Sequence, residues 1–150
     1  ELGTYSQMNA TLDQFYNNDA ITTQGNVGNW WEQALSFAAD YLKKIDKGEY
    51  VSTWGASDDV IQNIIGKGEW TRGMAKTRGA LGKVERRSLS DKRMAINPNG
   101  LPKGVYVVFE YDTRFENASD AEEVLVVRRD PDGHWKAFIY QTYQNSNPSP

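Results

Sequence analysis

The sequence predicts an α+β domain in which N-terminal helices pack on one face of a four-stranded antiparallel sheet. Apolar residues recur at helical spacing up to about residue 81, and from residue 83 onward they form extended segments separated by turns. The loops between the last segments are too short for parallel crossovers, which need about a dozen residues or more. Helices followed by sequential strands are therefore expected to form two layers around one core.

The first helix is expected to begin near Asn29. Asn is a good N-cap, and Glu32 can complete a capping box with it. Gly48 is a natural stop for this helix. The residues that recur at helical spacing, and that we expect to face the core, are Trp31, Ala34, Leu35, Ala38, Leu42 and Ile45.

Two further helices are expected before the sheet. A short connection contains Trp54, and Ser57 after it can cap the second helix, which Gly66 ends. The third helix is expected over residues 69–81, because Trp70, Met74 and Leu81 share one face. Gly82 can end it.

The remainder of the chain is expected to form four strands. The second strand is the clearest, and it places Glu110, Asp112 and Arg114 on one side, which we expect to be polar and solvated. Turn signals stand at residues 97–100 (NPNG) and 130–133 (DPDG). The strands are expected at residues 84–96, 105–115, 121–129 and 135–143.

The chain is expected to hold one domain. At 150 residues it can bury about two thirds of its surface. We expect a flexible arm over residues 1–28, a single α+β domain over residues 29–144 and a frayed tail over residues 145–150. The residues expected to be buried in its core are Trp31, Leu35, Leu42, Trp70, Phe109 and Trp135.

Composition and charge exclude several classes of protein. The chain carries 17 basic and 20 acidic residues, so the basic face that a nucleic-acid binder needs is not indicated. It has no Cys, which excludes disulfides and thiolate metal sites. No apolar run approaches the roughly 20 residues that span a bilayer. Composition thus indicates neither a nucleic acid nor a membrane as partner, and it leaves open which small molecule or protein is bound and what the oligomeric state is.

No motif for catalysis or for a cofactor is present. Nucleophile-elbow, zinc-protease, Walker and dinucleotide-binding patterns are all missing. His134 is the single His and follows a turn, so we expect no metal and no cofactor. Glu122 and Glu123 are neighbours on a strand and point to opposite faces, so they cannot act together as acid and base. We therefore expect no catalytic residue.

Arg78 is the most informative polar residue. It lies at the edge of the third helix's apolar face, which directs it toward the seam between helix and sheet. A guanidinium at such a seam loses hydration and needs an acceptor. We expect a structural ion pair between Arg78 and Glu122, with Glu123 as the second choice. The alternative, that Arg78 faces an anionic ligand, stays open.

Several motifs recur in one order along the chain and carry a family resemblance. Ile139 departs from the pattern, because a Gly is usual before the final Tyr. The matching residues are Trp54, Trp70, Arg78, Leu81-Gly82, Arg87, Tyr106-Val107-Val108-Phe109, Thr113-Arg114-Phe115, Glu122-Glu123-Val124, Asp132-Gly133, Trp135 and Tyr140. In this order they resemble the bacterial domain-of-unknown-function family numbered 4019.

The resemblance implies export to the periplasm or the cell exterior and no assigned enzymatic activity. It also implies a cystatin-like or nuclear-transport-factor-like architecture, in which a curved sheet wraps on helices and leaves a concave space. Our first hypothesis is therefore a non-enzymatic module that binds a ligand or a protein in this space. The residues expected to bind are Trp54, Arg78, Tyr111 and Thr113.

The alternative hypothesis is an isomerase- or dehydratase-like enzyme that uses the same space. Tyr111 would donate a hydrogen bond there, and Glu123 would act as the base if its face of the strand is the inner one. A packed interior would favour a scaffold role, and an open apolar cavity would favour ligand binding. A desolvated carboxylate inside such a cavity would favour catalysis.

Overall fold

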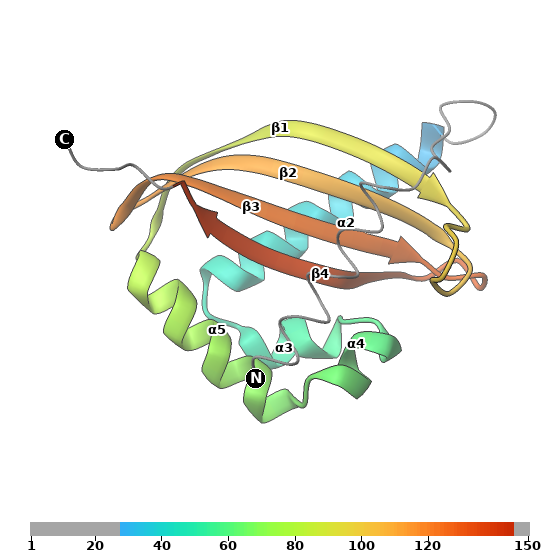
Figure 1. The fold of residues 1–150 in the computed structure, drawn as a ribbon, viewed down its shortest axis with the longest axis horizontal. Coiled ribbons are helices and arrows are strands. Elements are labelled where there is room, and N and C mark those ends of the chain that lie inside the picture. Colours follow the sequence, from blue (N-terminus) through green and yellow to red (C-terminus); the bar gives the residue numbers. More distant parts are fainter. Residues whose placement is uncertain (1–27, 146–150) are drawn as a thin grey trace.

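The computed structural model describes residues 28–145 and shows helices followed by an antiparallel sheet in the order β1-β2-β3-β4 (Figure 1). The α+β prediction is thereby confirmed. The helices are α2 (Gly28–Asp46), α3 (Tyr50–Gly55), α4 (Asp59–Ile64) and α5 (Lys67–Leu81). The strands are β1 (Val84–Ile96), β2 (Val105–Phe115), β3 (Ala118–Arg129) and β4 (Trp135–Gln144).

The predicted arm and tail fall almost entirely beyond this range. Of the arm, only Gly28 is described, as the first residue of α2, and of the tail only Asn145. Within residues 28–145, no helix has both the length and the apolar character that crossing a membrane requires. The described helices and strands form one layer of helices and one sheet (Figure 1).

Helix α2 presents a slightly different face to the core than the sequence predicts. Ala38, Leu42 and Ile45 are buried as expected, but Leu35 is 44% exposed, so that part of the prediction is wrong. Tyr41 is buried instead, and its ring packs edge-on against Tyr140 of β4 at 6.2 Å between centroids. A large aromatic ring buries more apolar area than a leucine. The face of α2 that packs on the sheet is therefore the one that carries Tyr41 rather than Leu35.

The other predicted core residues divide into two groups. Leu42, Trp70 and Phe109 are buried, which confirms them, whereas Trp31 and Trp135 are half-buried against the core. Both half-buried rings have a polar contact at the surface. The Trp135 indole donates to Gln33 Oε1 at 2.9 Å, and the Trp31 ring lies under the Lys92 ammonium at 4.8 Å.

The segment between α2 and α5 is more regular than predicted. The connection that contains Trp54 is a short helix, α3, and Asp58 rather than Ser57 caps α4, because its carboxylate accepts from Val60 N at 3.0 Å. Ser57 lies one residue earlier and forms a parallel bridge with Ala137 of β4. This bridge ties the helical layer to an edge of the sheet.

The strands agree with the prediction in position, with β3 beginning three residues early, at Ala118. Their burial does not alternate as expected along β2. Asp112 is exposed, but Tyr106 and Val108, on the same side of the strand, are buried. Strands buried on both faces carry continuous apolar runs, and the VYVVF segment of this inner strand is such a run.

Candidate functional site

Charged side chains gather where the C-terminal ends of α2 and α5 meet the sheet. We call this group the Glu123 cluster. Its members come from α2, α5 and every strand, so it joins the two layers of the fold. The members are Asp46, Arg78, Arg87, Thr113, Glu123 and Tyr140.

Glu123 is at the centre of this cluster and is completely buried. Arg87 holds it with two hydrogen bonds, Nε to Oε1 at 2.7 Å and Nη2 to Oε2 at 2.9 Å. The Thr113 hydroxyl donates to Oε1 at 2.6 Å, and the Tyr140 hydroxyl donates to Oε2 at 2.5 Å. Each carboxylate oxygen therefore has two donors, as a buried charge requires.

Asp46 is the second carboxylate of the cluster and the last residue of α2. It accepts from Arg87 Nη1 at 2.9 Å and Nη2 at 3.0 Å, and it forms an ion pair with Arg78 Nη2 at 3.1 Å. Its side chain is 30% exposed, whereas the other charged members are far less exposed. The two guanidinium groups and the two carboxylates balance in charge, and Asp46 is the member that meets water.

Arg78 is buried, as its position at the helix–sheet seam predicts, with 4% of its side chain exposed. Its carboxylate partner differs from the predicted one, because the ion pair forms with Asp46 and not with Glu122. Glu122 is half-buried and points away from Glu123, since neighbouring residues of a strand face opposite sides. Arg78 is also stacked over the Phe115 ring at 4.9 Å and contacts the Tyr140 hydroxyl at 3.4 Å, and its buried Nε has no acceptor.

The ionisation of the cluster follows from burial and from these contacts. Burial favours the neutral form of Arg87, but hydrogen bonds to Asp46 and Glu123 outweigh it and raise the pKa of Arg87. Burial, with the Glu123 charge as the second cause, raises the pKa of the Tyr140 phenol well above its usual value. Tyr140 therefore stays protonated and remains a donor to Glu123.

Tyr111 lies directly opposite Glu123 in the β2–β3 pairing. Burial raises the pKa of Tyr111 to about 12; the nearby Arg87 opposes this rise and the Glu123 charge adds to it. Of the four predicted binding residues, the structure thus brings Arg78 and Thr113 into one cluster and places Tyr111 beside it.

Trp54 is the fourth predicted binding residue, and it has a different environment. It is half-buried in α3, and its indole Nε1 donates to the carbonyl of Ile65 at 2.8 Å. Its own carbonyl accepts from Gln62 Nε2 at 2.9 Å. These contacts connect α3 with α4 and with the residue after it, so the ring acts as a structural link between the short helices.

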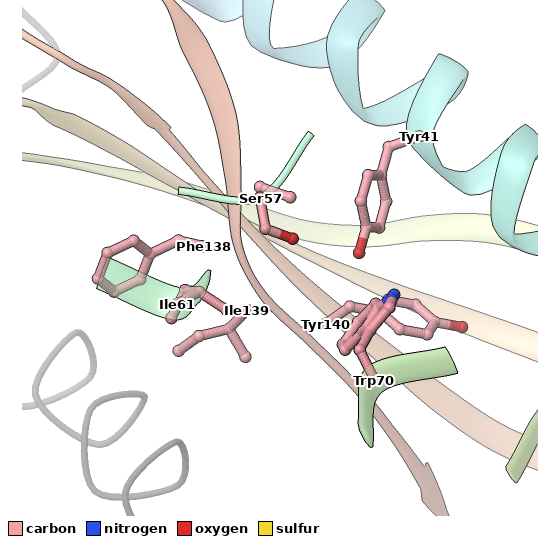
Figure 2. Close-up of a pocket in the computed structure, with 8 residues that line it drawn as sticks. Tyr41, Ser57, Ile61, Trp70, Phe138, Ile139 and Tyr140 are labelled. Carbon is pink, nitrogen blue, oxygen red and sulfur yellow. The ribbon is translucent and has the colours of Figure 1, made fainter. Parts of the chain in front are cut away.

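The space between the helical layer and β4 is closed. Figure 2 shows the side chains that converge there from α2, α4, α5 and β4. The gap that they leave has no room for a water molecule. Its lining consists of Tyr41, Ser57, Ile61, Trp70, Ala137, Phe138, Ile139 and Tyr140. This part of the interior is therefore a packed core and not a binding cavity.

An open recess lies on the solvent side of the Glu123 cluster, and we call it the α5 recess. Its volume is about 310 Å³. Asp46 and Arg78 belong to both the recess and the cluster, so the recess leads to the exposed side of the ion pairs. Its lining residues are Ile45, Asp46, Tyr50, Ala75, Arg78, Gly79, Gly82, Lys83 and Glu116.

Potential metal ligands lie together at the β3–β4 turn. Among residues 28–145, Asp130, Asp132 and His134 place one ligand atom each within 4.8 Å of one another. The Asp130 carboxylate accepts from the backbone N–H groups of Asp132 and His134 at 2.9 and 3.0 Å. These bonds hold the pKa of Asp130 below its usual value, and the bond from His134 has the larger effect. Such bonds are typical of a turn, so the absence of a metal stays a prediction.

Sequence comparison identifies a family and no characterised relative. A family model described as a protein of unknown function (DUF4019) matches residues 37–140. The match covers more than half of the chain, and the chain therefore belongs to this family. No curated protein and no solved structure matches the chain. The predicted family is thus confirmed, while the cystatin-like or nuclear-transport-factor-like architecture stays a prediction.

Proposed function

We propose that this member of the DUF4019 family is an exported, non-enzymatic module that binds a small molecule or a protein segment in the α5 recess. The observation that carries the proposal is the state of Glu123. A general base needs a free lone pair and access to the substrate. Glu123 has neither, since it is fully buried and accepts from Arg87, Thr113 and Tyr140.

The α5 recess supports binding because it offers space and mixed chemistry at the surface. Its volume of about 310 Å³ is at the lower end of small-molecule sites, which start near 300 Å³. Ala75 and Gly79 give an unobstructed helix wall, and Tyr50 adds an aromatic ring. Lys83 and Glu116 bring one charge of each sign. A ligand with a small apolar body and a polar end fits such a site.

A ligand screen by NMR on isotope-labelled protein tests this proposal. Hits should shift the amide signals of recess residues, and Gly79→Phe should abolish them. Gly79 lines the recess and a Cβ there meets nothing within 4 Å, so we expect a Phe side chain to occupy recess space without a clash at its Cβ. Thr77→Phe, at an exposed position of the same helix outside the recess, is the matched control. Signal shifts that persist in Gly79→Phe, or that disappear equally in Gly79→Phe and Thr77→Phe, would refute the proposal.

Export is the second part of the proposal, and it is supported by the family resemblance. Fractionation of cells that make the native protein tests it with an antibody against the folded domain. We expect the protein in the periplasmic or extracellular fraction. Recovery with a cytosolic marker would contradict export and leave the recess proposal unaffected.

One observation favours the enzymatic alternative, namely that a buried carboxylate lies beside two phenols. Tyr140 is hydrogen-bonded to Glu123, and Tyr111 is opposite it in the sheet. An isomerase-like enzyme would incorporate deuterium from solvent into small ketones, and Glu123→Gln would abolish this exchange. We expect no exchange above that of buffer, because the carboxylate is completely buried and each of its oxygens already has two donors.

A further inference from the structure

We infer that Arg78 and Arg87 form a carboxylate receptor that Asp46 occupies from within the chain, and that a ligand carboxylate entering the α5 recess replaces Asp46. This inference rests on the proposed function, because the ligand arrives through the same recess. It adds the chemical class of the ligand, a small organic carboxylate with a short apolar body.

The first argument is the geometry around Asp46. Its two oxygens accept two hydrogen bonds from Arg87, at 2.9 and 3.0 Å, and form an ion pair with Arg78 Nη2 at 3.1 Å. The two bonds from Arg87 run in parallel, which is the bidentate arrangement that a planar carboxylate makes with Arg. The receptor is therefore already shaped for a carboxylate, and any carboxylate in that place would meet the same donors.

The second argument is that Asp46, unlike Glu123, can leave. Asp46 is 30% exposed and Glu123 is fully buried, so only Asp46 can turn into water and be rehydrated. Asp46 also ends α2, where the negative end of the helix dipole disfavours a carboxylate. The chain turns just beyond it, at Gly48 with φ 78°. Rotation of one side chain is enough to empty the receptor.

The third argument is charge. With Asp46 rotated outward, Arg78 and Arg87 oppose only Glu123, so the cluster carries one net positive charge. A monoanionic ligand restores the balance, while the charges of Lys83 and Glu116 in the recess lining offset each other. Arg78 Nε, which is buried and has no acceptor, is a further donor of the receptor that Asp46 does not use.

The fourth argument is the shape of the recess beyond the carboxylate. Ile45, Ala75 and Gly79 give apolar walls, and Tyr50 contributes a ring. Burial of methylene groups against such walls adds affinity in proportion to the area covered. A ligand with a short alkyl chain should therefore bind more tightly than a bare carboxylate, which separates recognition by the recess from simple anion binding.

Side-chain Nε–Hε NMR signals of Arg78 and Arg87 provide the test, with sodium butyrate and sodium acetate as probes and sodium chloride at equal ionic strength as reference. We expect both signals of the wild type to shift with butyrate, and less strongly with acetate. Asp46→Ala should bind butyrate about tenfold more tightly or better, because an open state populated at 10% or less reduces the apparent affinity by that fraction. Asp40→Ala, an exposed position of the same helix, should match the wild type.

If Asp46→Ala does not fold, Asp46→Asn keeps the shape of the side chain and removes the charge, and it should also bind butyrate more tightly than the wild type. Wild-type Arg signals that do not respond to butyrate, or Asp46 variants that bind no better than the wild type, would overturn the inference. The proposed function would survive that result if a ligand without a carboxylate still binds the recess. Butyrate binding that persists in Gly79→Phe would instead overturn both, because the recess would not be the route.

Discussion

Removal of the Arg87 side chain is the sharpest test of the Glu123 cluster. Arg87 bridges the two carboxylates, with two hydrogen bonds to Glu123 and two to Asp46. In Arg87→Ala, Asp46 is partly exposed and keeps Arg78, so its loss resembles that of a surface pair, about 0–1 kcal/mol. Glu123 is fully buried and loses Arg87, its one ion-pair partner among residues 28–145, which costs about 3–5 kcal/mol.

Two donors remain on Glu123 and moderate this cost. Thr113 and Tyr140 still satisfy one lone pair on each oxygen, so we expect a loss of about 3–4 kcal/mol in the free energy of unfolding. That is a large part of the 5–15 kcal/mol that typical domains have. Urea unfolding followed by tryptophan fluorescence measures it.

Arg86→Ala is the matched control for this experiment. Arg86 is the preceding residue of β1 and is exposed, so its removal should change the stability by about 0.5 kcal/mol or less. Arg87→Lys keeps the charge but loses the fork and should fall between the two. If Arg87→Ala loses less than about 1 kcal/mol at an unchanged urea slope, the ion pair with Glu123 does not carry the stability argued above.

Four other predictions each concern a single site. Gly79→Ala should raise the stability by about 0.5–1 kcal/mol, because the position is helical and unobstructed, whereas Gly82→Ala should lower the melting temperature, since φ is 82° and a Cβ would lie 2.7 Å from Glu116 Cβ. Asp58→Ala should cost about 3 kcal/mol by urea unfolding, because Arg128, whose side chain is only 12% exposed, loses its carboxylate partner and α4 loses its cap. Burial raises the pKa of Tyr111 in the folded protein to about 12, so its contribution to the free energy of unfolding is complete below pH 10 and is lost as the pH rises toward about 12. Tyr111→Phe should therefore flatten the decline of stability with pH in that interval. An unchanged slope would contradict the raised pKa of Tyr111.

The fold could be predicted from the sequence wherever local signals are strong. The limits of β1 and β2 agree with their predicted ranges, because Gly82 and the turn before Val105 punctuate the chain clearly. The short helix α3 could not be predicted in this way, since it spans six residues and its apolar pattern is too brief to be periodic. The exposure of Leu35 could not be predicted either. An apolar stripe defines which face of a helix is buried only to within the rotation between one residue and the next.

The site was less predictable, because it depends on parity and on long-range pairing. The need of Arg78 for an acceptor was evident from its place at the helix seam, but the choice between Glu122 and Glu123 depends on which strand face points inward. Asp46 is 32 residues before Arg78 and on another helix, so no spacing connects them. One signal was present in the sequence, namely an acid at the end of a helix that favours cations there.

The position of Asp46 at the end of α2 also explains how stability and the inferred binding can depend on one cluster. Glu123 is completely buried and accepts two hydrogen bonds from Arg87, so it is the fixed carboxylate of the cluster. Asp46 shares Arg87 with Glu123 but its side chain is 30% exposed, so water can replace its donors. Buried pairs contribute less net stability than their Coulomb attraction suggests, because desolvation opposes them. If Asp46 is replaceable as we infer, one cluster both holds α2 and α5 against the sheet and offers Arg78, with Arg87 behind Asp46, to a ligand in the α5 recess.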